Sequence, residues 1–170
     1  MADHNPKLLA DSHYYVPEAL QAVINAAGLA GGFGSGMARK VMAFTGAAGL
    51  GAVGAVPLFT VTGAVAFRIT AICTEDLVCG AGATLSVGTP ATVAGVIGVT
   101  GAADIDNGDI WFAAAPATVL DTLANSMLAF VIGDGADIQG NVLVDAISDG
   151  TIEFTVFWTA LTANGAVAAV

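Results

Sequence analysis

The side chains of this chain that could do chemistry are mostly carboxylates, and several of them gather in one turn. The segment Asp104-Ile105-Asp106-Asn107-Gly108-Asp109 holds three carboxylates and a carboxamide. Oxygen ligands of this kind suit calcium, so Asp104, Asp106 and Asp109 are candidate calcium ligands. Paired acids such as Asp104 and Asp109 could also serve glycan hydrolysis. Asp and Asn are equally ordinary turn residues, because they tolerate left-handed backbone, and a solvated turn is the simpler interpretation.

Residues 69–170 lack the basic groups on which most enzymes rely. Eleven of the fourteen carboxylates lie there, without any Lys, Arg or His. The two histidines, His4 and His13, are remote in sequence, and no positioned nucleophile accompanies them. Without an imidazole, or a cation to hold a developing anion, we expect a non-enzymatic protein with no catalytic residues and no cofactor.

Two further motifs have simple structural interpretations. Gly49-Leu50-Gly51-Ala52-Val53-Gly54 spells G-x-G-x-x-G, but Pro57 and β-branched residues follow at once. A dinucleotide site needs a helix after that turn, so we expect none here. Cys73 and Cys79 are the only cysteines. They could close a small disulfide loop, although buried free thiols are the simpler expectation.

The composition favours a protein that is covered by other protein chains. Only 11% of residues are charged, and the mean hydropathy is +0.80. A membrane protein is the competing explanation, but the long uncharged stretches are interrupted by Gly and Pro. The net charge of −10 argues against nucleic acid as a direct partner, since phosphate binding needs clustered cations. We therefore expect protein partners, no direct nucleic acid and no membrane.

The charge is divided unevenly along the chain. Residues 1–68 carry four cations against three carboxylates, whereas residues 69–170 carry carboxylates alone. A slightly basic arm joined to an acidic body suits subunits whose arm lies on the acidic surface of a neighbour. An acidic surface without any directed contact explains the same division equally well.

Residues 1–56 are predicted to form an N-terminal arm. Pro17 and Glu18 are typical of a helix start, and a short apolar stripe that includes Leu20 and Ile24 follows. A Gly- and Ala-rich stretch then runs to residue 56. Tyr14 and Tyr15 could anchor in the groove of a partner or staple this helix. The candidate assembly contacts are Lys7, Tyr14, Tyr15, Leu20, Ile24, Arg39 and Lys40.

Residues 57–170 are predicted to form a β-domain. Residues 65–73 alternate apolar and polar side chains, and further short strands are expected at 58–62, 84–87, 92–99, 109–113 and 127–132. A hairpin is expected from Val142–Ile147 and Thr151–Trp158 around Ser148-Asp149-Gly150. A helix within 118–125 is an open possibility. The prediction is a mainly β fold, a β-sandwich or jelly-roll-like domain preceded by an extended arm with one short helix.

Several segments of the β-domain resemble a known group of proteins. These are Val56-Pro57-Leu58-Phe59-Thr60-Val61-Thr62-Gly63, Ile69-Thr70-Ala71-Ile72-Cys73-Thr74-Glu75-Asp76-Leu77, Gly82-Ala83-Thr84-Leu85-Ser86-Val87-Gly88-Thr89, Asp109-Ile110-Trp111 and Phe157-Trp158-Thr159-Ala160-Leu161. The pattern is similar to small structural proteins of tailed bacteriophages. The resemblance covers residues 56–170, and its motifs are structural, so no functional residues are carried over.

The resemblance implies an auxiliary capsid protein, of the decoration or cement kind, in the virion. Such a subunit assembles in the cytoplasm of the bacterial host and binds the major capsid protein and copies of itself. Trimers or other closed symmetric clusters would cover the excess apolar surface. A tail, baseplate or fibre component that binds a receptor, with calcium as a possible stabiliser, is the alternative expectation.

Overall fold

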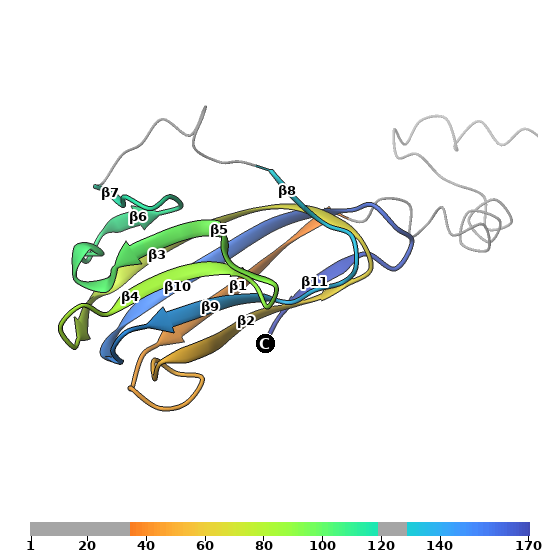
Figure 1. Cartoon of the computed structure of the whole chain (residues 1–170). Coiled ribbons are helices and arrows are strands. Elements are labelled where there is room, and N and C mark those ends of the chain that lie inside the picture. Colours follow the sequence, from red (N-terminus) through yellow and green to blue (C-terminus); the bar gives the residue numbers. More distant parts are fainter. Residues whose placement is uncertain (1–34, 119–128) are drawn as a thin grey trace, which may run out of the picture. The chain divides into compact units, whose positions relative to one another are not determined.

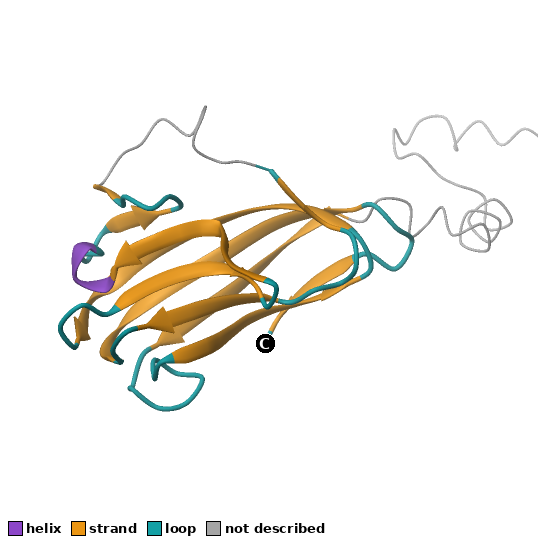
Figure 2. Ribbon diagram, in the orientation of Figure 1, coloured by secondary structure: helices purple, strands orange, loops and turns teal. Residues whose placement is uncertain are grey.

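The computed structural model describes residues 35–118 and 129–170. This part of the chain is mainly β (Figure 1) and consists of two antiparallel sheets. Its one helical element within the described residues is a single 3-10 turn, Ala102–Asp104 (Figure 2). No helix in this part of the chain is long and apolar enough to cross a bilayer.

The first sheet, called sheet A, is built around two long strands. The central pair is β10 (Ile147–Ala160) and β3 (Val65–Cys79), which run antiparallel side by side. The sheet has the order β1-β10-β3-β6-β7, and β8 pairs with the start of β3. The remaining strands are β1 (Ser35–Ala43), β6 (Asp109–Trp111), β7 (Ala117–Thr118) and β8 (Phe130–Ile132).

The second sheet, called sheet C, has five strands in the order β11-β2-β9-β4-β5. Its strands are β2 (Gly54–Thr62), β4 (Thr84–Thr89), β5 (Thr92–Gly101), β9 (Ile138–Leu143) and β11 (Ala166–Ala169). The strands expected at 58–62, 84–87 and 92–99 correspond to β2, β4 and β5. The start of the strand expected at 127–132 lies outside the described residues, and β8 forms its end.

One hydrophobic core is shared by both sheets, an arrangement consistent with a β-sandwich. The alternation expected in 65–73 is confirmed, because Val65, Phe67 and Ile69 are buried while Arg68 between them is exposed. Trp111 is fully buried, as expected for a core residue. Trp158 is only half-buried, because it lies near the end of β10 and covers Gly36 of the edge strand.

The expected hairpin around Ser148-Asp149-Gly150 is wrong. Ile147–Ala160 forms one strand, and the three residues occupy an irregular part of its pairing with β3, where the register shifts. Gly150 has φ +100°, and an added Cβ would lie 2.5 Å from the carbonyl oxygen of Asp76. The Gly-containing signal therefore marks a β-bulge within a continuous strand.

The chain changes sheets at the residues that the hairpin would have used. Val142 belongs to β9 of sheet C, and Ile147 begins β10 of sheet A. Between them Val144 has φ +72°, which is unfavourable for a β-branched residue. The apolar run 142–147 thus supplies core residues to two layers instead of one strand.

The predicted arm does not extend to residue 56. Ser35–Ala43 pairs with β10 over nine residues, and β2 begins at Gly54. A Gly-rich loop joins them, and the G-x-G-x-x-G segment within it leads into strand β2, as expected for a motif without a dinucleotide-binding helix. The expected helix at 17–27 and nearly all of the possible helix at 118–125 lie outside the described residues.

Candidate interaction surface

The outward side of sheet A is the most distinctive surface of the described residues. Cross-strand pairing brings Met37, Phe157 and Arg68 into one row across β1, β10 and β3. Two rows further along, Val41, Glu153, Ile72 and Ile110 form a second line across four strands. We call the outward side chains of β1, β10, β3 and β6 the sheet A face. It is continuous because neighbouring strands are in register.

Large apolar side chains on this face are open to solvent. Met37 is 62% exposed, Val41 54% and Phe157 47%, and Ile72 is also exposed. Single exposed apolar residues are common on soluble proteins, but contiguous groups are typical of interaction sites. The sheet A face therefore has the composition of a surface that another molecule covers.

Charge on the sheet A face is sparse and partly neutralised. Arg39 forms an ion pair and hydrogen bond with Glu153, and this bond raises the pKa of the Arg39 guanidinium. Arg68 makes no hydrogen bond or ion pair with any described residue. Arg39 is thus paired within the fold, whereas the Arg68 guanidinium is available to a partner.

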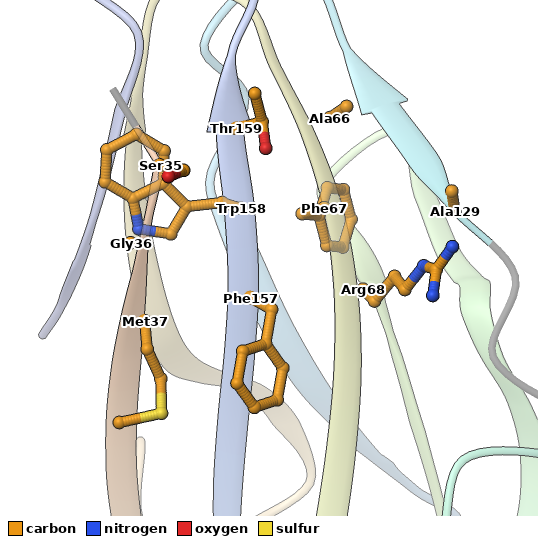
Figure 3. Close-up of a pocket in the computed structure, with 10 residues that line it drawn as sticks. All are labelled: Ser35, Gly36, Met37, Ala66, Phe67, Arg68, Ala129, Phe157, Trp158 and Thr159. Carbon is orange, nitrogen blue, oxygen red and sulfur yellow. The ribbon is translucent and has the colours of Figure 1, made fainter. Parts of the chain in front are cut away.

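A groove lies at the end of the sheet A face near the start of β1. It has a volume of about 610 Å³, and Met37, Phe157 and Arg68 contribute to its lining. Figure 3 shows these three side chains on neighbouring strands, with the Arg68 guanidinium directed toward Ala129, the residue before β8. The hydroxyls of Ser35 and Thr159 add polar groups at its edge. The groove combines apolar area with one cation, which suits an anionic partner group.

On the outward side of sheet C, two polar side chains are buried under another part of the chain. Asn141 and Ser86 lie opposite each other on β9 and β4, and both are buried. The amide of Asn141 and the hydroxyl of Ser86 both donate to the carbonyl oxygen of Val93, at 2.8 Å and 2.9 Å. Residues at the start of β5 therefore cover this part of sheet C, and the covered polar groups are satisfied.

The predicted calcium ligands are not brought together. Asp104 and Asp106 are exposed, whereas Asp109 is buried and its Oδ2 accepts the backbone N–H of Asp106 at 3.1 Å. The N–H of Asp109 returns a bond to the carbonyl of Asp106 at 3.0 Å, which closes the turn. Within residues 35–118 and 129–170, no group of three or more His, Cys, Asp or Glu side chains could hold a metal ion.

The candidate acid pair Asp104 and Asp109 lies apart from the groove on sheet A. Neither the groove on sheet A nor the smaller hollow beside β8 is lined by Asp104 or Asp109. A neighbouring carboxylate, Asp76, accepts the N–H of Asn107 at 2.7 Å and ties the turn to β3. These acids therefore shape a loop at one end of the domain, and the simpler of the two interpretations agrees with the geometry.

The two cysteines are both free thiols on β3. Cys73 is buried, and its Sγ donates to the carbonyl of Glu75 at 3.1 Å. Burial raises the pKa of the Cys73 thiol, and this disfavours the thiolate. Cys79 is half-buried. The small disulfide loop that the sequence allowed is not formed.

The predicted contact residues divide into two groups. Lys7, Tyr14, Tyr15, Leu20 and Ile24 lie outside the described residues. Arg39 and Lys40 belong to β1, and as neighbours in a strand they point to opposite sides. Arg39 lies on the sheet A face, while the Lys40 ammonium donates to the main-chain oxygen of Val170 at 2.5 Å. Both residues are thus part of the β-domain and not of an arm.

The sequence analysis did not identify the exposed apolar residues of the sheet A face. Met37 and Val41 were assigned to the arm, and Phe157 was assigned to a hairpin strand without a role. The alternation of Met37, Arg39 and Val41 with Ala38 and Lys40 is a period-two signal that could have identified β1. Comparison with family models, curated proteins and solved structures finds no match to this chain.

Proposed function

We propose that this chain is a non-enzymatic structural subunit of a tailed-bacteriophage virion, an auxiliary capsid protein of the decoration or cement kind. The observation that supports it is the sheet A face, where Met37, Val41, Ile72 and Phe157 are exposed together. In this role the face lies against the major capsid protein or other copies of the chain, and the added contacts reinforce the head. Removal of apolar area from water would favour such contacts.

A β-sandwich fits this task because its two sheets present broad, rigid surfaces. Val41, Ile72 and Ile110 lie in one row across the sheet A face, with Glu153 of β10 between Val41 and Ile72. The residues before β1, with Lys7, Tyr14, Tyr15, Leu20 and Ile24, form the proposed arm with one short helix, and they add contact area on a neighbour. Major capsid protein and copies of the chain are the proposed partners, without direct nucleic acid or membrane contact.

The alternative, a calcium-stabilised tail, baseplate or fibre component, relied on the acidic turn 104–109 for its calcium site. Asp109 is engaged with the backbone of that turn, and the carboxylates do not form a ligand group in the described residues. No other observation favours the tail over the head, so we carry the capsid role forward.

The test is co-sedimentation of the purified chain with heads, and separately with tails, of the phage that encodes it. Val41→Asp places a charge on the sheet A face at an exposed position of an edge strand. We expect it to weaken head binding at least about tenfold, a loss of about 1.4 kcal/mol. Thr60→Asp, at an exposed position on the outward side of sheet C, is the matched control and should bind as the wild type does.

Two results would overturn the proposal. One is head binding by Val41→Asp at wild-type strength together with a normal melting curve. The other is binding to isolated tails alone. Deletion of residues 1–34 tests the proposed arm separately, and it must end before Ser35 because β1 begins there. Weaker head binding by this deletion, with the β-domain still folded, is the expected result.

A further inference from the structure

The described part of the chain has an acidic end that lies opposite the groove. Six exposed carboxylates gather there, on the segments that surround the end of β3 and the start of β10: Glu75, Asp76, Asp104, Asp106, Asp145 and Asp149. The groove with Arg68 lies near the start of β3 and the end of β10. Since β3 and β10 run antiparallel along the sheet, the two sites occupy opposite ends of the same pair of strands (Figure 1).

Arg68 cannot reach this acidic end within one molecule. Arg68 and Glu75 lie seven positions apart on β3, which corresponds to about 23 Å at about 3.3 Å per strand residue. The other two described cations are already engaged, Arg39 with Glu153 and Lys40 with the main-chain oxygen of Val170. The described residues carry ten carboxylates against these three cations, so any second copy presents an acidic surface.

We propose that the groove binds the acidic end of a second copy of this chain, with Arg68 as the residue that receives its carboxylates. Phe157 lies next to Arg68 in the same row, with Met37 beyond it, and both would exclude water from the contact, which strengthens the ion pairs formed there. Asp104 and Asp106 are suitable partners because both are exposed, and no described residue donates a hydrogen bond to their side chains.

The contact joins two different surfaces, so it is head-to-tail. Each copy offers one groove and one acidic end, and contacts of this kind continue into a ring or an extended array. This inference rests on the proposed function as an assembling subunit, and it names the surfaces through which copies meet. The row that contains Val41 and Ile72 is left free for the major capsid protein.

The experiment measures self-association of the full chain by sedimentation velocity in the absence of phage particles. Arg68→Glu should weaken association at least about tenfold, and so should the double variant Asp104→Lys/Asp106→Lys. An equimolar mixture of the two variants should associate again, because each groove then meets an end of opposite charge. Lys40→Glu is the matched control, since it makes the same change in net charge outside the groove.

Three outcomes overturn the inference: a wild-type chain that stays monomeric, an Arg68→Glu variant that associates normally, or a mixture that does not recover. If the mixture does not recover association, and if deletion of residues 1–34 weakens association equally, the N-terminal segment is the occupant of the groove. Head binding by Arg68→Glu, measured separately by co-sedimentation, shows whether the proposed function survives when this contact fails.

Discussion

The outward sides of the two sheets differ in how far the chain itself covers them. On sheet C, the start of β5 covers Ser86 and Asn141, and the Val93 carbonyl satisfies both. On sheet A, no described segment covers Met37, Val41 and Phe157, which remain about half exposed or more. The chain thus covers part of the outward side of sheet C, where Val93 and Val99 of β5 are still exposed, whereas it leaves the named side chains of the sheet A face in solvent.

This difference separates residues that serve the fold from residues that serve contact. A buried, hydrogen-bonded Asn141 contributes to stability, because its removal leaves polar groups unpaired. An exposed Phe157 contributes little to stability, because the unfolded chain exposes it as well. The proposed contact with other chains would use exposed residues of this second kind.

The largest expected effect tests whether the sheet A face is independent of the core. Phe154 and Phe157 lie on the same strand, one fully buried and the other on the sheet A face. Phe154→Ala should lower the free energy of unfolding by about 3–5 kcal/mol. Phe157→Ala should lower it by less than about 1 kcal/mol while reducing self-association. Chemical denaturation of both variants gives the numbers, and equal losses would show that the face is part of the fold.

The next effect tests the covered side of sheet C. Asn141→Ala removes the bond to Val93 and leaves the Gln139 amide without its acceptor at 2.7 Å. We expect a loss of about 1–3 kcal/mol in the free energy of unfolding. Thr60→Ala, exposed on the same sheet, should change it by about 0.5 kcal/mol or less. A thermal melt in which both variants match the wild type would contradict the contrast between the two sheets.

The sequence predicted the parts of the fold that depend on local pattern. Alternation in residues 65–73 assigned the core side of β3, because a half-buried strand needs a period of two. The burial of Ser86 and Asn141 could not be predicted in this way. It depends on the path of β5 over β4 and β9, which is a long-range arrangement with no local signal.

The sequence predicted that the protein has a contact surface, but it did not predict which residues form that surface. An apolar composition with few charges pointed to surfaces that other chains cover, but it did not say which side of which sheet. That choice depends on β1, and the Gly-rich residues 31–36 and the paired cations Arg39 and Lys40 made its sequence look unlike a strand. The acidic turn suggested calcium ligands because Asp is a residue type that suits calcium. In the structure, the Asp109 carboxylate accepts a backbone N–H of the same turn.

A smaller effect concerns the segment that joins the two sheets. Val144 is 73% exposed and has φ +72°, so it packs little and its backbone is strained. Val144→Gly should raise the free energy of unfolding by about 0.5–1 kcal/mol, since relief of strain exceeds the entropy cost of glycine. Val144→Ala keeps a Cβ and serves as the control with little gain. A lower melting temperature for the glycine variant would mean that the Val144 side chain contributes packing at this connection.

The smallest effect tests whether polar groups on the sheet A face stabilise the domain as those under β5 do. Arg39 and Glu153 form an ion pair on β1 and β10, and the Arg39 side chain is mostly in solvent. The bond raises the pKa of Arg39 above an already high value, so the Arg39 guanidinium stays charged throughout the neutral range, and its contribution is lost as the pH rises through that raised pKa. Solvent and salt screen such a pair, so Arg39→Met should shift the melting temperature by less than about 2 °C. A larger drop in melting temperature that does not depend on salt would show that this ion pair stabilises the fold, as Asn141 does. The sheet A face would then contribute to stability as well as to contact.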